Sequence, residues 1–357
     1  MSDKMIVQSH KGPYTAFFDP DAIGKLNAAS YEGAHIIIDS HVAELYANDL
    51  DNVLAHGSVL RIEAAEDNKS LERMPEYVGH LVANGIRRDH QLIAIGGGII
   101  QDITCFLAAT LLRGVRWRLY PTTLLAQADS CIGSKSSINV AAAKNIVGTF
   151  TPPNEVHICG AFLDTLDEVD LRSGIGEILK VHAIDGPASF AALAADYGKL
   201  LSDRDVLNHY IRGALEIKHP YIEADEFDTG PRNIFNYGHT FGHAIEAATD
   251  YAIPHGIGVT IGMDMANFVA VRSGRAPEAH FERMHPTLKA NFLGFEKTDV
   301  PLPGFLAAIS KDKKNLGSGS VTIIIPDQEG VLEKVRRAND SEFSEICSAY
   351  LTVARVS

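Results

Sequence analysis

The sequence predicts two domains: an α/β N-terminal domain over residues 1–160 and an all-helical C-terminal domain over residues 161–357. Three observations lead to this prediction. The chain has 357 residues, enough for two domains of ordinary size. Short apolar runs alternate with helix-like segments up to about residue 160. Beyond that point, long helical patterns dominate.

The α/β prediction rests on four short apolar runs that fit buried strands, at residues 35–39, 92–95, 116–120 and 156–159. Segments between them, at residues 72–84 and 103–112, have helical periodicity. Such alternation predicts a parallel, doubly wound sheet. Ligands of such sheets bind beyond the carboxyl ends of the strands, so we expect the site in the cleft between the two domains.

The C-terminal half is predicted to be mainly helical. Helical patterns occur at residues 171–183, 188–195, 205–219, 238–251 and 256–271. One late strand signal, at residues 321–326, predicts a small hairpin across residues 327–330.

Composition narrows the functional class. The chain has 32 Lys and Arg against 45 Asp and Glu, a net charge of −13, which argues against a nucleic-acid binder. A local basic pocket could still bind a small anion. The four scattered cysteines form no C-x-x-C motif and fit a reducing compartment. The opening residues lack an apolar stretch and the apolar runs are too short to cross a bilayer. We therefore expect a cytoplasmic enzyme with no membrane partner.

A glycine run, Gly96-Gly97-Gly98, follows the strand predicted at 92–95 and opens a helix. Main-chain N–H groups at such a turn can bind a phosphate, aided by the helix N-terminus. A plain tight turn is the alternative, and the G-x-G-x-x-G fingerprint is absent. Asp39, at the end of a strand, could bind ribose hydroxyls or cap a helix. Four further polar residues could reach a nucleotide or simply lie in loops and turns: Glu66, Lys69, Thr122 and Thr123.

A second constellation has the residue types of a metal site. His239 and His243 share one helical face at i, i+4, but the glutamate of H-E-x-x-H is missing, so this is no zincin. His255 opens the next helix and Glu177 lies on an earlier one. One carboxylate and two imidazoles suffice for a catalytic zinc with an open position. Histidines that cap helices around a domain interface are the alternative.

Basic residues also stand in motif-like surroundings beside Gly, Asn or Asp. Together they could hold an anionic substrate, although any single one could equally be an exposed surface residue. They are Arg113, Lys135, Lys144, Lys180, Lys218, Arg232, Lys313 and Lys314.

In combination, these segments resemble the 3-dehydroquinate synthases and their sugar-phosphate cyclase relatives. The matching segments occur in the family's order and span most of the chain. They are GGGIIQD (96–102), RGVRWRLYPTTLLAQADSCIGSK (113–135), KNIVGTF (144–150), GEILK (176–180), RNIFNYGHTFGHAIE (232–246), PHG (254–256) and KDKK (311–314).

The resemblance implies an NAD-binding N-terminal domain, a metal-binding C-terminal domain and a homodimer. It implies Glu177, His239 and His255 as ligands of a divalent metal, zinc or else cobalt. It implies NAD contacts at Asp39, Glu66, Lys69, Gly96, Gly97, Gly98, Asp102, Thr122, Thr123 and Thr165. Catalytic or substrate-binding roles fall on Arg113, Asp129, Lys135, Lys144, Asn145, Lys180, Lys218, Arg232, Asn236, His243 and a lysine of the pair Lys313 and Lys314.

The implied reaction belongs to the shikimate pathway of aromatic amino acid biosynthesis. It converts 3-deoxy-D-arabino-heptulosonate 7-phosphate, a small anionic sugar phosphate, to 3-dehydroquinate and phosphate. In the family this proceeds by NAD-mediated transient oxidation, phosphate elimination and intramolecular aldol closure.

Several positions depart from the family's usual pattern: Gln101 and Ser134 replace glycines, Val181 and His182 replace Tyr-Gly, and Ile257 replaces a glutamate. Relatives acting on other sugar phosphates often lose an arginine and an asparagine that this chain keeps as Arg232 and Asn236, which favours a substrate with a carboxylate. Two alternatives stay open. One is a cyclase for sedoheptulose 7-phosphate or glucose 6-phosphate, and the other is a metal-dependent polyol dehydrogenase, against which the lysine cluster argues.

Overall fold

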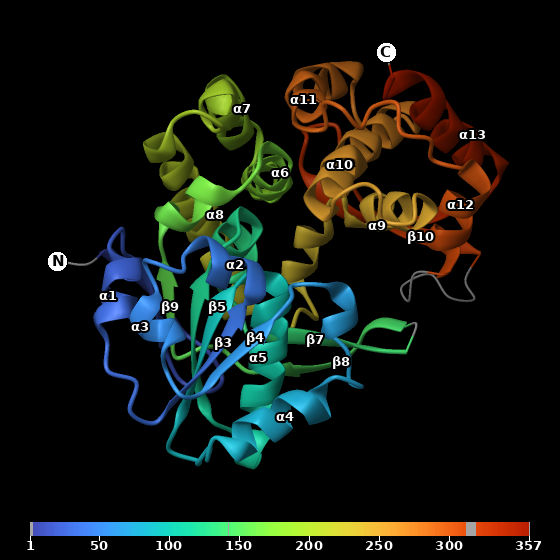
Figure 1. Cartoon of the computed structure of the whole chain (residues 1–357). Helices are drawn as coiled ribbons and strands as arrows, with labels where there is room; N and C mark the ends of the chain where they lie inside the picture. Colours follow the sequence, from blue (N-terminus) through green and yellow to red (C-terminus); the bar gives the residue numbers. More distant parts are fainter. Residues whose placement is uncertain (1–2, 142, 312–318, 357) are drawn as a thin grey trace. The chain divides into compact units, whose positions relative to one another are not determined.

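A computed structural model describes residues 3–141, 143–311 and 319–356 (Figure 1). The chain divides into two compact units. Unit 1 comprises the chain up to Asp167 together with Lys218–Thr229, and unit 2 comprises Glu168–Ile217 and the chain from Gly230 onward. Each unit is described by itself below.

Unit 1 is built on a seven-stranded sheet. Its strands, in spatial order, are β1 (Asp3–Val7), β2 (Tyr14–Phe18), β9 (Glu155–Ile158), β6 (Arg116–Pro121), β5 (Gln91–Gly96), β3 (Ala34–Asp39) and β4 (Val59–Ile62). All neighbours from β2 to β4 pair in parallel, and β1 adds an antiparallel edge. The predicted parallel sheet and its four predicted strands, β3, β5, β6 and β9, are therefore confirmed.

Burial explains which strands were predictable. All six residues of β3 are buried, as are five of six in β5, as expected for strands covered on both faces. The edge strand β1 instead exposes three of its five residues. Strands β1, β2 and β4 therefore lacked the continuous apolar run that identified the others.

Helices and one hairpin complete unit 1. The helices are α1 (Ala22–Ala28), α2 (Ser40–Leu45), α3 (Asp51–Leu54), α4 (Met74–Ala83) and α5 (Gly98–Thr110). The hairpin pairs β7 (Lys135–Val140) with β8 (Ala143–Phe150) antiparallel. Helix α5 begins at the third glycine of the run, five residues before the predicted start at residue 103. Side chains of β3, β5 and their flanking helices form one buried apolar cluster.

Unit 2 is helical apart from one hairpin. Its helices are α6 (Glu168–Asp185), α7 (Pro187–Asp196), α8 (Arg204–Ala224, whose last turns belong to unit 1), α9 (His239–Ala248), α10 (His255–Arg272), α11 (Glu278–Asn291), α12 (Leu302–Lys311) and α13 (Ser341–Ala349). The hairpin pairs β10 (Ser320–Pro326) with β11 (Leu332–Ala338). All five predicted helices and the predicted hairpin are present, whereas α11, α12 and α13 were not predicted.

Helix α10 is the centre of unit 2. Every residue from Gly256 to Ala270 is buried, so this helix is surrounded by others rather than amphipathic. It packs against α9, α6 and α11. Two ligand candidates, His239 and His255, are the first residues of α9 and α10.

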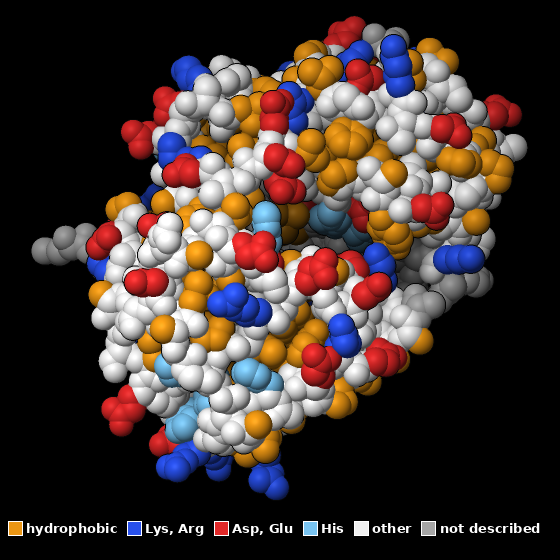
Figure 2. Space-filling model, in the orientation of Figure 1, with side chains coloured by type: hydrophobic (Ala, Val, Ile, Leu, Met, Phe, Trp, Pro, Cys, Tyr) orange, Lys and Arg blue, Asp and Glu red, His pale blue; other side chains and the backbone are white. Residues whose placement is uncertain are grey.

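Surface features agree with the composition. Acidic side chains are scattered over the face shown in Figure 2, in line with the net charge of −13. Within the described ranges, no helix is both long enough and apolar enough to cross a membrane. All four cysteines are buried thiols.

Candidate active site

The predicted NAD-contacting residues of unit 1 lie at or just beyond the carboxyl ends of parallel strands. Asp39 ends β3, Gly96 ends β5, and Thr122 and Thr123 follow β6. Thr165 ends a 3₁₀ helix that follows β9. Parallel strands bring their carboxyl ends to one edge, which is where ligands of this sheet class bind.

The glycine turn leaves no room for side chains. A Cβ at Gly96 would lie 2.5 Å from Cγ1 of Ile100, and one at Gly97 would lie 2.8 Å from Cγ2 of Thr123. The N–H of Thr122 donates to the carbonyl of Gly96 at 3.1 Å, which ties the two strand ends together. The turn therefore presents the main chain and the N-terminus of α5 at this edge, as an anion site requires.

A charged cluster stands beside this turn. Nζ of Lys69 lies 3.1 Å from Oδ2 of Asp102 and donates to Oδ1 of Asn145 at 3.1 Å. Ser137 donates to Asp102 through its N–H at 3.2 Å and its hydroxyl at 3.0 Å. Burial raises the pKa of Asp102, while Lys69 and Ser137 oppose that rise. Lys69 is itself buried, so Lys69 and Asp102 form a buried ion pair and not a solvated surface contact.

Asn139 is a contributor that the sequence reasoning missed. Its side-chain amide donates to Oε2 of Glu66 at 2.7 Å, and its Oδ1 accepts from the N–H of Asn145 at 2.9 Å. Asn145 has a positive φ of 54°. The hairpin thus fixes both Glu66 and Asn145, a role visible only after β7 and β8 pair.

Asp39 caps helix α2, which was one of its two predicted roles. Its Oδ1 accepts from the N–H of His41 at 3.0 Å. Burial raises the pKa of Asp39, while backbone hydrogen bonds from His41 and Ala64 oppose that rise, and a ribose contact stays a prediction. Thr165 contacts Oη of Tyr46 at 3.2 Å.

The predicted anion-binding lysines of unit 1 face carboxylates. Lys135 pairs with Asp228, and Lys218 pairs with Asp129, whose main-chain carbonyl also accepts from it at 2.6 Å. Asp228 has a positive φ of 56°. Exposed positions are occupied by Lys144 on β8 and Arg113 at the end of a 3₁₀ turn.

In unit 2 three predicted metal ligands converge. Nε2 of His255 lies 3.4 Å and Nε2 of His239 lies 3.8 Å from Oε1 of Glu177. Two nitrogen or oxygen ligands at about 2.1 Å from a tetrahedral zinc lie about 3.4 Å apart. The donor types and their spacing therefore fit a divalent ion such as zinc.

His243 makes an overlapping set. Donor atoms of His239, His243 and His255 all lie within 4.8 Å of one another. His243 is exposed one turn further along α9, whereas Glu177 is only 1% exposed. Glu177 lies close to both imidazoles and already pairs with Lys180, so its choice as the third ligand, with His243 on the open side, rests on the family resemblance.

The electrostatics of the cluster decide which of these groups carries a proton. Burial alone would raise the pKa of Glu177, but Lys180 and the two imidazoles hold it well below its usual range. Burial, with Lys180 nearby, holds the pKa of His239 well below its usual range, so that imidazole is neutral. Burial lowers the pKa of His255, yet hydrogen bonds to Glu177 and Glu246 raise it to about 10. A metal would replace that proton.

Glycines let the three ligand helices meet. A Cβ at Gly256 would lie 1.8 Å from the carbonyl oxygen of Ser173, and one at Gly176 would lie 2.2 Å from that of Gly256. Each glycine directly precedes or follows a predicted ligand, Glu177 or His255. The Ser173 hydroxyl also accepts from the N–H of Gly256 at 3.0 Å. Main-chain contact between α6 and α10 thus sets the ligand positions.

Anion-binding candidates of unit 2 lie on α6 and on the segment before α9. Lys180 pairs with Glu177 and lies 5.9 Å from the ring centre of Phe235. Arg232 is buried on the 3₁₀ segment Pro231–Asn236, just before α9. Asn236 donates to the carbonyl of Asn233 at 2.9 Å. The candidates Lys313 and Lys314 fall outside the described residues.

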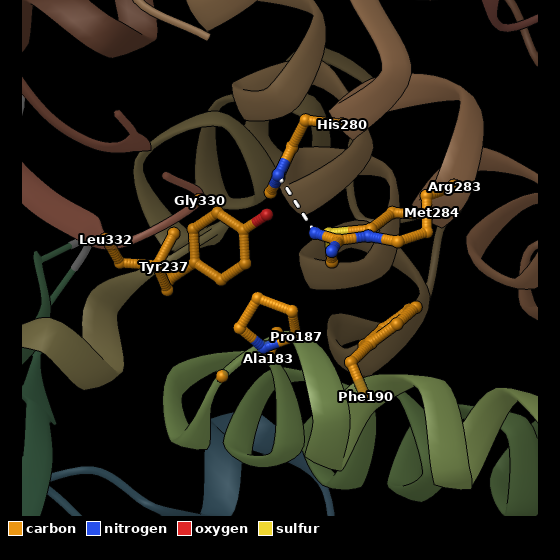
Figure 3. Close-up of a pocket in the computed structure, with 10 residues that line it drawn as sticks. Ala183, Pro187, Phe190, Tyr237, His280, Arg283, Met284, Gly330 and Leu332 are labelled. Carbon is orange, nitrogen blue, oxygen red and sulfur yellow. Dashed lines mark hydrogen bonds between the residues drawn. The ribbon is translucent and has the colours of Figure 1, made fainter. Parts of the chain in front are cut away.

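Unit 2 contains two hollows of very different size. A hollow of about 510 Å³ lies between α9 and α12, with His243 and Lys311 on its wall, which is a volume suited to a small ligand. Figure 3 shows a second cavity, where Tyr237 and Arg283 lie around His280. Its volume is about 10 Å³, room for a single water. The smaller cavity is too small for a substrate.

Comparisons with known proteins identify the family. Residues 59–173 match the model described as 3-dehydroquinate synthase N-terminal, and residues 174–315 match 3-dehydroquinate synthase C-terminal. The 3-dehydroquinate synthase of Dictyoglomus thermophilum is 35% identical over 323 residues, which are 90% of each chain.

Two solved structures are similar along almost the whole chain. One is 2-epi-5-epi-valiolone synthase from Streptomyces hygroscopicus with NAD⁺ and Zn²⁺ bound, at 27% identity and a TM-score of 0.81, covering 96% of this chain and 97% of that one. The other is 2-deoxy-scyllo-inosose synthase complexed with carbaglucose-6-phosphate, NAD⁺ and Co²⁺, at 20% identity and a TM-score of 0.82, covering 97% and 99%. At that identity the second likeness shows the fold alone. With both family domains matched and a relative 35% identical over nine tenths of its length, the chain belongs to the 3-dehydroquinate synthase family.

Proposed function

We propose that the chain is a 3-dehydroquinate synthase that converts 3-deoxy-D-arabino-heptulosonate 7-phosphate to 3-dehydroquinate and phosphate. The family makes it a carbocycle-forming sugar-phosphate cyclase. The observation that carries the choice of substrate is the retention of Arg232 and Asn236 next to the helix that begins at His239. A guanidinium offers two parallel donors to a carboxylate, which a neutral hydroxymethyl group cannot match.

A divalent metal and NAD are the cofactors that we propose. Glu177, His239 and His255 would hold the metal, which we propose is zinc because two imidazoles and one carboxylate suit it, with cobalt as the alternative. When bound, the metal supplies Lewis acidity and NAD supplies a hydride acceptor that returns the hydride within one turnover. The glycine turn at Gly96–Gly98, with Asp102 and Lys69, would hold the nucleotide.

The side chains of the chain itself bind and orient the substrate. Lys180 and Arg232 are buried, so their attraction for phosphate or carboxylate oxygens is weakly screened, and for Lys180 it is shared with its partner Glu177. The predicted partners in unit 1, Lys135 and Lys218, already face carboxylates, so an anionic substrate has to compete for them. From the sequence we propose that both units contribute to one site, that the protein is a homodimer and that it is cytoplasmic.

A substrate panel tests the proposal. The purified protein, supplied with NAD and zinc, is offered the acid seven-carbon sugar phosphate, sedoheptulose 7-phosphate and glucose 6-phosphate, and phosphate release is measured. We expect the acid substrate to have the highest kcat/KM. If the protein prefers either sugar phosphate that lacks a carboxylate, we would instead infer a cyclase of secondary metabolism.

A further inference from the structure

In both candidate histidine ligands, Nδ1 faces a hydrogen-bond acceptor and Nε2 faces Glu177. In His255, Nδ1 lies 2.8 Å from Oε1 of Glu246, and Nε2 faces Glu177 at 3.4 Å. In His239, Nδ1 lies 3.2 Å from the carbonyl oxygen of Tyr237, and Nε2 faces Glu177 at 3.8 Å. A carbonyl can only accept, so Nδ1 of His239 carries the proton. One histidine thus has a main-chain acceptor and the other a carboxylate.

Glu246 is held against His255 by the fold. It lies in the last turns of α9 with a buried side chain, and an unpaired carboxylate there would be costly. Where α9 meets α10, Gly258 leaves room for it, because a Cβ at that position would lie 3.1 Å from Oε1 of Glu246. The main chains of Gly242 and Gly258 are also in contact, which fixes the distance between the two helices.

We propose that Glu246 is a positioning residue for the metal centre. Its carboxylate accepts the Nδ1 proton of His255, which makes the imidazole more basic and leaves Nε2, now facing Glu177, as the nitrogen that binds the metal when the metal replaces its proton. This inference rests on the proposed metal site and adds a residue outside the ligand set. Removing a carboxylate partner of this kind typically weakens metal binding by about 10–100-fold.

The test measures metal affinity and not turnover. In Glu246→Gln the side chain keeps its shape and loses its charge. Zinc affinity is measured by competition with a chelator, and the visible spectrum of the Co²⁺-loaded protein reports ligand geometry. We expect roughly 10–100-fold weaker zinc binding and an altered Co²⁺ spectrum, with circular dichroism like that of the wild type.

A matched control exists in the same unit. Asp264 is a fully buried carboxylate on α10 that pairs with His285 at 2.9 Å. It lies nine residues beyond His255 on the helix, roughly 13 Å along its axis at 1.5 Å per residue. Asp264→Asn should lower stability and leave zinc affinity unchanged. Loss of affinity in Asp264→Asn equal to that in Glu246→Gln would show a general effect of buried carboxylates and overturn the proposal.

A second variant covers the case in which Glu246→Gln does not fold. Gly258→Ala keeps Glu246 but crowds its carboxylate, and alanine is favourable in a helix; we expect a several-fold loss of zinc affinity. Affinities of Glu246→Gln or Gly258→Ala within threefold of the wild type would overturn the role of Glu246 while leaving the proposed reaction intact. A wild-type protein that binds neither zinc nor cobalt would remove the metal site itself.

Discussion

Replacing Gly256 by alanine tests how the ligand helices are held together. The added Cβ would lie 1.8 Å from the carbonyl oxygen of Ser173, whereas ordinary contact begins at 3.4 Å. The neighbour is main chain, which cannot swing aside as a side-chain end can. Helix α10 would therefore have to move from α6 by the difference, roughly 1.6 Å.

That movement is large on the scale of a metal site. Ligand distances must hold within about 0.2 Å, and Glu177 and His255 lie on the two helices that would part. We expect at least a tenfold loss of zinc affinity. Overpacking of this kind costs about 1–3 kcal/mol of unfolding free energy, partly offset by up to about 1 kcal/mol from the better helix propensity of alanine.

The assay pairs chelator competition for zinc with urea unfolding. Gly198→Ala is the matched control, because that glycine lies in unit 2 with no heavy atom within 4 Å of an added Cβ. The control should bind zinc like the wild type. If Gly256→Ala also binds zinc like the wild type, main-chain contact between α6 and α10 does not set the ligand geometry and the reasoning fails.

Three further predictions follow from single residues. Arg232→Ala should lower kcat/KM for the acid substrate by roughly 30- to 1000-fold, since losing a charged hydrogen bond costs about 2–4 kcal/mol; an equal loss with a neutral sugar phosphate would contradict the carboxylate role. His255→Ala should lose most of its bound divalent ion as well as activity, and full metal content by elemental analysis would refute the ligand assignment. Burial, with the imidazole of His90 beside it, lowers the pKa of His35 to about 4, so between pH 6.5 and 4 the unfolded chain binds a proton that the folded chain does not. His35 should therefore contribute a loss of about 1.6 kcal/mol of stability in urea from pH 6.5 to 5, and His35→Gln should reduce the total fall by that amount; an unchanged slope in the variant would exclude His35 as a source.

Strands and helices were predictable where burial made the pattern simple. Continuous apolar runs identified the buried strands β3 and β5, and long segments with helical periodicity identified α6 and α10. Strand β8 could not be identified in this way, because its first four residues are all exposed. The helical pattern placed α5 at residues 103–112, whereas the glycine run, which was expected to open a helix, marks its start at Gly98.

The candidate site was predictable by residue type and only partly by role. The family resemblance grouped Glu177, His239 and His255, and their distances in the structure suit one ion. Glu246 stands in the same motif, yet its contact with His255 depends on how closely two helices approach. Asn139 likewise needed the register of the β7–β8 hairpin. Such roles arise from tertiary distances that no local pattern encodes.

The central claim is a cyclisation in which NAD is recycled. The most direct measurement follows phosphate, 3-dehydroquinate and NADH absorbance together while the protein acts on 3-deoxy-D-arabino-heptulosonate 7-phosphate with NAD and zinc. The account predicts one phosphate and one 3-dehydroquinate for each substrate consumed, with no accumulation of NADH. Steady NADH accumulation without phosphate release would contradict it and identify a polyol dehydrogenase.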